Sequence, residues 1–206
     1  MDKQPSSATG VGRNELAAVV LAAGASKRLG RPKQLVTFDG RSLLQRAVDK
    51  CLPVCRLGVV VVTGAEREAV GETLRGEPVL VVHNSAWRDG LASSITTGIA
   101  AVPADSKAVL LMLCDQPKLS SAELAQLVSV WSRHPDRVVA SRYGATFGAP
   151  AIFPRAVFPM LEALRGDRGA KSLIEQLADA ILVDLPGAEL DIDRPEDLDR
   201  LRDSER

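Results

Sequence analysis

The sequence predicts one α/β domain of three layers, with a mainly parallel sheet covered by helices on both faces. Short β-branched runs alternate with longer stretches of helical spacing, and repeated strand–helix units of this kind join parallel strands. The chain has 206 residues, 46% of them hydrophobic, which is enough for one domain with a buried core. No internal repeat or long linker divides it, so we expect the domain at 15–206. Residues 1–14 are polar and predict a disordered lead-in.

The elements of the first half follow from the spacing of apolar residues. An apolar run predicts the first strand at 17–22, and the turn Asp39-Gly40 precedes a helix. Apolar positions recur there at helical intervals, at Leu43, Leu44, Ala47, Val48 and Leu52. Strands are then expected at 57–62 and 78–82, with a polar helix at 66–75 between them and a further helix at 91–102.

The second half opens with the most apolar strand, at 108–113, which ends abruptly before Asp115. The next helix, at 121–131, has Ser120 or Ser121 as a plausible N-cap and Glu123 in its first turn. Short strands are expected at 138–140, 151–153 and 181–183, a turn-rich stretch at 144–150, and helices at 155–164 and 170–178. Ligands bind at the carboxyl ends of parallel strands, so we expect the site in the loops after 17–22, 78–82, 108–113 and 151–153.

Charge and composition exclude several classes of protein. Acidic and basic residues balance to a formal net charge of zero, which argues against a nucleic-acid partner. No apolar run approaches the roughly 20 residues of a membrane span, so we expect no membrane partner. The cysteines Cys51, Cys55 and Cys114 are odd in number and follow no disulfide or metal pattern. We therefore expect reduced thiols in a cytoplasmic protein.

The loop after the first strand has the character of an anion-binding loop. Ala22, Ala23 and Gly24 have side chains small enough for a flat base or a ribose to approach the backbone. Ser26, Arg28 and Lys33 follow within reach of a triphosphate, whose charge such N–H groups and cations would bind. The loop contains neither a dinucleotide fingerprint nor a Walker A motif. The alternative interpretation is a tight turn with ordinary surface cations.

Carboxylates form the second chemical feature. Asp115 directly follows the strand at 108–113, so it lies at the carboxyl edge of the sheet with the first loop. Asp191 and Asp193 alternate along an extended segment and point to one side. Hard oxygen ligands of this kind suit Mg²⁺ that bridges nucleotide phosphates. Alternatively, Asp115 and Asp193 simply cap the helices that follow them.

Several motifs, in order, resemble those of one family. Residues 20–33 resemble the signature loop of the MobA-like nucleotidyltransferases, closest to their molybdenum cofactor cytidylyltransferase branch. The segments 90–95, 113–117, 148–150, 166–170 and 191–198 resemble further motifs of that branch. The resemblance implies a Rossmann-like fold of the nucleotide-diphospho-sugar transferase type. Two residues depart from the family pattern: Leu29 replaces a frequent Met, and Arg194 replaces a usual Thr beside the Asp pair.

The resemblance also implies an activity and its site. A phosphate on molybdopterin would attack the α-phosphorus of CTP and take up CMP, with Mg²⁺ or Mn²⁺ bound and pyrophosphate released. The resemblance also implies a molybdoenzyme or its chaperone as a further partner. The implied catalytic residues are Arg28, Lys33 and Asp115, and the implied metal ligands are Asp115, Asp191 and Asp193. The implied nucleotide-binding residues are Leu21, Ala22, Ala23, Gly24, Ser26, Arg28, Lys33, Gly90, Ser93 and Ser94, and the implied acceptor-binding residues are Gly148, Pro150, Gly166 and Asp167.

The identity of the base and of the acceptor leaves alternatives open. The Ala-Ala-Gly opening and Gln116 beside Asp115 favour CTP by the resemblance, and a methyl at Ala23 would crowd a purine more than a pyrimidine. The same fold also serves guanylyltransferases and sugar- or alditol-phosphate nucleotidyltransferases. Two other readings are a chaperone that delivers the cofactor without transferring a nucleotide and a relative recruited as an oxidoreductase on a small heterocycle.

Overall fold

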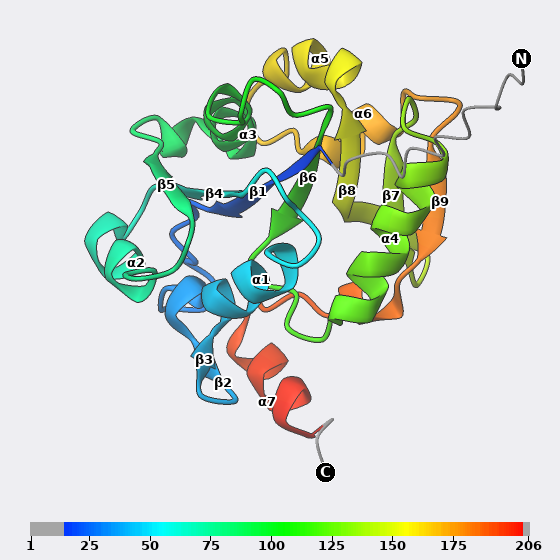
Figure 1. Ribbon diagram of the computed structural model, residues 1–206. Coiled ribbons are helices and arrows are strands. Elements are labelled where there is room, and N and C mark those ends of the chain that lie inside the picture. The colour runs from blue at the N-terminus through cyan, green and yellow to red at the C-terminus, as the bar shows by residue number, and fades with distance from the viewer. Residues whose placement is uncertain (1–14, 204–206) are drawn as a thin grey trace, which may run out of the picture.

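A seven-stranded sheet forms the centre of the structure, a computed structural model that describes residues 15–203 (Figure 1). The lead-in expected at 1–14 lies outside the described residues. The strand order is β5-β4-β1-β6-β8-β7-β9. The strands are β1 (Leu16–Ala22), β4 (Val59–Thr63), β5 (Leu80–His83), β6 (Ala108–Leu113), β7 (Val139–Tyr143), β8 (Thr146–Pro154) and β9 (Ile181–Asp184).

The sheet is mainly parallel, as predicted, but β8 runs against its neighbours. Strand β1 pairs in parallel with β4 and β6, whereas β8 pairs antiparallel with both β6 and β7. The strand expected at 151–153 therefore begins earlier, and the stretch 144–150 contributes a tight hairpin between β7 and β8. Since β8 is reversed, its beginning, and not its end, lies at the edge where β1 and β6 end. The expectation that the loop after 151–153 contributes to the site was wrong for this reason.

Helices cover both faces of the sheet and complete the three predicted layers. Helices α1 (Leu43–Cys51), α2 (Arg67–Thr73) and α4 (Ser121–Arg133) cover one face, and α3 (Leu91–Ala100), α5 (Phe158–Glu162) and α6 (Ala170–Ile174) cover the other (Figure 1). Strand β1 is buried along its whole length, with Ala18 and Val20 packed on the first face and Val19 and Leu21 on the second. This period-2 alternation fixes the register of the central strand, because a shift of one residue would exchange the two faces.

A smaller layer closes one end of the molecule. The short strands β2 (Thr37–Phe38) and β3 (Arg41–Ser42) form a hairpin that the sequence did not predict, and helix α7 (Pro195–Asp203) packs nearby (Figure 1). A third apolar cluster lies in this layer, with Phe38 of β2 packed against it; it contains Leu29, Val36, Leu43, Ile192, Leu198 and Leu201. The four 3₁₀ turns described are η1 (Lys33–Leu35), η2 (Trp87–Asp89), η3 (Arg155–Val157) and η4 (Pro186–Ala188).

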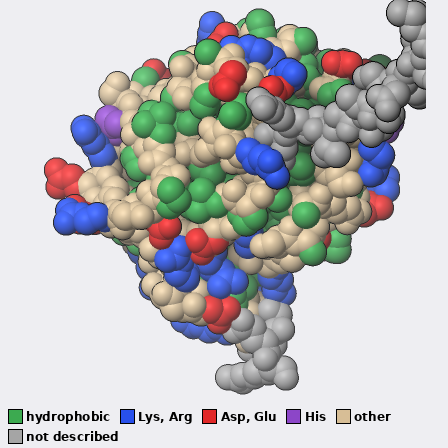
Figure 2. All heavy atoms as spheres, in the orientation of Figure 1, with side chains coloured by type: hydrophobic (Ala, Val, Ile, Leu, Met, Phe, Trp, Pro, Cys, Tyr) green, Lys and Arg blue, Asp and Glu red, His purple; other side chains and the backbone are tan. Residues whose placement is uncertain are grey.

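The surface mixes both signs of charge. On the face shown in Figure 2, acidic and basic side chains are interspersed around the rim, while hydrophobic side chains gather toward the centre. Among the helices of residues 15–203, none is long and apolar enough to cross a membrane.

Candidate active site

A cavity of about 1090 Å³ opens at the edge of the sheet where β1 and β6 end. Its walls come from the loop after β1, the loop after β5, the residues after β6, the α5–α6 loop and the segment that precedes α7. Parallel strands bring these connections to one edge, which is where α/β sheets bind ligands. The residues predicted as nucleotide ligands that line it are Leu21, Ala22, Ala23, Gly24, Ser26, Arg28, Lys33, Gly90 and Ser94.

The loop after β1 is held in place by its own polar groups. The Ser26 carbonyl accepts hydrogen bonds from the backbone N–H groups of Leu29 (3.1 Å) and Gly30 (3.2 Å), which closes the turn. The Ser26 hydroxyl accepts a further bond of 3.0 Å from the backbone N–H of Lys33. These bonds bring Lys33 back toward the end of β1. Its side chain therefore enters the cavity from a 3₁₀ turn and not from a free surface loop.

Gln34 supports the loop from inside the protein. Its side chain is buried, and Nε2 donates to the carbonyl oxygens of Ala22 (2.9 Å) and Gly24 (2.7 Å). These two bonds fix the backbone on either side of Ala23. Sequence reasoning missed Gln34. Its amide directly precedes the apolar residues Leu35 and Val36, and this position was a signal for a buried side chain that forms hydrogen bonds.

Lys33 lies between two of the predicted carboxylates. Its Nζ contacts the Asp115 carboxylate and donates to Asp193 Oδ1 at 2.9 Å, while Arg28 Nη2 lies 2.7 Å from Asp193 Oδ2. Burial alone would lower the pKa of Lys33, but the charge and hydrogen bonds of Asp115 and Asp193 outweigh it and raise this pKa. Burial pushes the pKa of Asp193 upward, and the bonds and charges of Lys33 and Arg28 outweigh it, so this pKa is lowered. Lys33 and Asp193 are thus held in their charged forms.

Asp115 and Asp191 have oxygen atoms that fit a divalent cation. Within the described part of the chain, Asp115 Oδ1 and Asp191 Oδ1 are buried without a hydrogen-bond partner. Burial and the neighbouring charge of Asp115 raise the pKa of Asp191 to about 7. A bound cation would satisfy both oxygens and remove this repulsion. Residues 15–203 contain no group of three His, Cys, Asp or Glu side chains placed to hold a metal by themselves, so a cation here would also need oxygens from a ligand.

Some predicted residues lie beside the cavity without lining it. The Ser93 hydroxyl has two acceptors for its single proton, Ala86 O (2.9 Å) and Gly90 O (2.8 Å), and it accepts from Asn84 Nδ2 (2.8 Å), so it organises the loop before α3. Of the residues predicted to bind the acceptor, Asp167 lines the cavity, whereas Gly148, Pro150 and Gly166 do not. The Gly166 carbonyl instead accepts a 3.0 Å bond from Ala92 N, which joins the α5–α6 loop to the beginning of α3.

Gln116 also lies outside the cavity, although the sequence argument used it as a sign of CTP. It is buried, and its Nε2 donates to the carbonyl oxygens of Ala149 and Ala188, each at 3.0 Å. The residue therefore ties the end of β6 to β8 and to the turn η4. This position gives it a part in placing Asp115 and no contact with a base in the cavity.

Trp87 and Arg88 are lining residues that the sequence analysis did not assign. They form part of η2, and the Arg88 guanidinium stacks over the Trp87 ring at 4.4 Å from the centroid. An aromatic residue beside a cation in the loop after a parallel strand was an available signal. The flat Trp87 ring and Leu91 make this wall partly apolar, whereas Lys33 and the aspartates contribute charged groups to the same cavity.

The family of the chain follows from comparison with known proteins. The MobA-like NTP transferase domain matches residues 18–181, and the chain belongs to this family. Nicotine blue oxidoreductase of Paenarthrobacter nicotinovorans is 33% identical over 195 residues, 89% of this chain and 94% of that protein. The purine catabolism protein PucB of Bacillus subtilis is 31% identical over 200 residues, 91% of this chain and 96% of that protein.

A cytidylyltransferase and a protein with a manganese complex are also among the similar proteins. The molybdenum cofactor cytidylyltransferase of Escherichia coli is 22% identical over 183 residues, 87% of this chain and 91% of that protein. The crystal structure of Rv0371c from Mycobacterium tuberculosis in complex with manganese is 27% identical, with a TM-score of 0.76, and the match covers 92% of this chain and 98% of that one. The predicted Rossmann-like nucleotidyltransferase fold is confirmed.

Proposed function

We propose that this chain transfers CMP from CTP to the phosphate of a molybdopterin-type acceptor and releases pyrophosphate. The observation that carries the proposal is the charge arrangement in the cavity. Arg28 and Lys33 lie beside a small-residue loop, and Asp115, Asp191 and Asp193 face them. Cations together with metal-binding carboxylates are what the neutralisation of a triphosphate requires.

The proposed reaction needs positioning and charge neutralisation from the protein, but no protein nucleophile. An oxygen of the acceptor phosphate forms a bond to the α-phosphorus of CTP, and the bond from that phosphorus to the β-phosphate oxygen breaks. Arg28 and Lys33 would bind the β- and γ-phosphates and stabilise the charge of the departing pyrophosphate. In the structure Asp193 neutralises both cations, so a triphosphate would replace the aspartate as their partner.

Asp115, with Asp191 or Asp193, would hold a divalent cation. When bound, Mg²⁺ or Mn²⁺ supplies positive charge that neutralises the phosphates and makes the α-phosphorus more electrophilic. The buried oxygens of Asp115 and Asp191 support this assignment, and the manganese complex of Rv0371c supports a metal in this family. Lys33, already beside Asp115, would then hold phosphate and carboxylate together.

The choice of CTP rests on the base-side wall. Ala23 lines the cavity, is nearly fully buried, and has its backbone fixed on either side by Gln34, and a methyl at this position would crowd a purine more than a pyrimidine. This favours a pyrimidine. The likeness to the E. coli cytidylyltransferase supports the same choice of nucleotide and the molybdopterin acceptor. The buried free thiols of Cys51, Cys55 and Cys114 support a reducing, cytoplasmic location.

A second candidate function is a redox reaction on a small heterocycle. It is favoured by the 33% identity to nicotine blue oxidoreductase, which exceeds the identity to the cytidylyltransferase. The flat wall formed by Trp87 and Arg88 suits a planar ring in either reaction. Guanylyl transfer, sugar- or alditol-phosphate acceptors and cofactor delivery without transfer are the remaining alternatives.

One assay separates these functions. The protein is incubated with Mg²⁺, molybdenum-loaded molybdopterin and each nucleoside triphosphate in turn, and pyrophosphate is measured. We expect release with CTP, and none from the variant Asp115→Asn. Release with GTP alone, or only with a sugar or alditol phosphate as acceptor, would replace the proposed substrates. Nucleotide binding without pyrophosphate release would favour delivery of the molybdenum cofactor without nucleotidyl transfer. Oxidation of a reduced nicotinamide cofactor that depends on an added heterocycle would favour the redox function.

A further inference from the structure

Lys50, on helix α1, is a buried cation that the proposed reaction does not use. Only 8% of the residue is exposed, and Nζ donates to the carbonyl oxygens of Pro117 (3.1 Å) and Gln116 (3.4 Å). Among residues 15–203 it forms no ion pair with a carboxylate. Burial, together with the nearby charge of Arg46, lowers the pKa of Lys50 to about 8. The charges of Glu123 and Asp49 offset this shift only in part, and a buried ammonium group without a direct ion pair is costly and is found more often at functional sites.

Lys50 lines a second cavity, of about 510 Å³. Of the described residues, none lines both this cavity and the candidate active site. Three cations, Arg46, Lys50 and Lys118, line the second cavity, and Asp39 is the one acidic side chain among its described lining residues. Asp39 lies 3.3 Å from Arg46 Nη1 and is mostly exposed, so it neutralises only part of this charge. The cavity therefore keeps an excess of positive charge.

Two further groups in the same cavity are free to donate hydrogen bonds. Arg46 Nε is buried and has no hydrogen-bond partner within the described residues. Helix α4, thirteen residues long, begins at the cavity with Ser121; the Ser120 hydroxyl caps the N–H of Glu123, which leaves the N–H groups of Ser121 and Ala122 without a partner within the helix. Glu123, the acidic residue in the first turn of α4, is already engaged by Ser120 N at 2.8 Å and Gly187 N at 2.7 Å.

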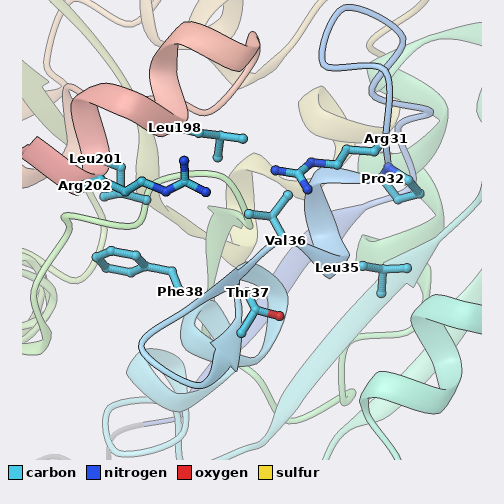
Figure 3. A pocket seen from close by; sticks show the side chains of 9 residues that line it. All are labelled: Arg31, Pro32, Leu35, Val36, Thr37, Phe38, Leu198, Leu201 and Arg202. Carbon is cyan, nitrogen blue, oxygen red and sulfur yellow. The ribbon is translucent and has the colours of Figure 1, made fainter.

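The adjacent cavity provides a contrast. It has a volume of about 310 Å³ and shares Phe38 and Leu201 with the cavity of Lys50. Figure 3 shows Arg31 and Arg202 pointing toward each other across its mouth. Both arginines are exposed, and its buried lining residues, Val36, Leu198 and Leu201, are apolar. Water solvates an exposed arginine, whereas the buried Lys50 ammonium has three N–H donors and two carbonyl partners among the described residues, so an anion would find its shielded third donor beside Lys50.

We propose that the cavity beside Lys50 binds a small tetrahedral oxyanion, either inorganic phosphate or the phosphate group of a larger molecule. Lys50, Arg46 and the first N–H groups of α4 would be its ligands. Lys50 also donates to the two residues that follow Asp115, so a bound anion would act on the loop that carries a candidate metal ligand. The site does not depend on the proposed transferase function.

Isothermal titration calorimetry with inorganic phosphate, without nucleotide or metal, tests this site. The candidate active site also contains cations, so we expect two binding sites in the unmodified protein. Lys33→Met, the matched lysine substitution in the first cavity, should remove one of them. Lys50→Met should weaken phosphate binding at the other site at least tenfold. Arg46→Met should weaken the same site, which keeps the test decisive if Lys50→Met does not fold.

The remaining outcomes identify the ligand or overturn the proposal. Pyrophosphate and phenyl phosphate are titrated in parallel with Lys33→Met protein. Tighter binding of phenyl phosphate than of inorganic phosphate would assign the site to a phosphorylated molecule, and the reverse order would assign it to the free ion. A phosphate site that survives both Lys50→Met and Arg46→Met unchanged, or a single site that Lys33→Met abolishes, would show that no anion binds beside Lys50.

Discussion

Replacing Lys33 by Met should destabilise the protein in the absence of a divalent cation. The Lys33 side chain is 18% exposed and that of Asp115 is 10% exposed, so their contact is largely shielded from water. Removing one partner of a buried pair costs about 3–5 kcal/mol, and uptake of a proton by the abandoned carboxylate reduces this. We expect a loss of about 3 kcal/mol. For a chain of 206 residues this lowers the melting temperature by roughly 6–12 °C.

Thermal unfolding at pH 8 with a chelator measures this effect. The matched control is Lys27→Met, since Lys27 lines the same cavity, is exposed and has no ion pair among the described residues. This control should change the free energy of unfolding by less than about 0.5 kcal/mol. Mn²⁺ should restore more stability to Lys33→Met than to the unmodified protein, because it neutralises the carboxylates that the lysine leaves unpaired. Equal stabilities of Lys33→Met and Lys27→Met would refute the reasoning.

Three other substitutions test separate parts of the account. Asp115→Asn should abolish pyrophosphate release while circular dichroism shows an unchanged fold, and normal activity would leave Asp115 with only a structural role. Gly98→Ala would place a Cβ 2.4 Å from Val19 Cγ1, so urea unfolding should show a loss of roughly 1–3 kcal/mol; unchanged stability would contradict the close packing of α3 on β1. The folded-state pKa of Lys50, about 8, lies below its ordinary value of 10.5, so the unfolded chain binds more protons between these pH values. Between pH 8 and 10.5 the unfolding free energy of the unmodified protein should therefore rise by about 3 kcal/mol relative to that of Lys50→Met. A difference that stays constant over this range would mean that folding does not lower the pKa of Lys50.

The sequence predicted the parallel half of the sheet well because its signals are local. Strand β1 and strand β6 are continuous apolar runs, which is the pattern of strands buried on both faces. Strand β8 was harder to predict, since Gly148 and Pro150 are poor strand formers. Pairing with β6 and β7 overrides that local preference, and only the folded sheet contains this pairing.

The candidate site could be predicted where a sequence motif itself includes the charged residues. Lys33 and Asp115 are 82 residues apart, yet both follow buried strands, so their meeting at one edge was foreseeable. The role of Lys50 was not foreseeable, because it consists of contacts with the backbone carbonyl groups of Gln116 and Pro117, which lie 66 and 67 residues further along the chain. A carbonyl acceptor has no sequence signature, so such contacts become visible only in three dimensions.

The fate of the α-phosphorus of CTP shows whether the protein transfers CMP to the pterin. CTP labelled at this atom is incubated with the protein, Mg²⁺ and molybdenum-loaded molybdopterin, and the products are separated. The proposed transfer predicts that the label moves to the pterin in an amount equal to the pyrophosphate formed, and that Asp115→Asn prevents it. Label that remains in intact CTP while the same protein oxidises or reduces a heterocycle would contradict the claim.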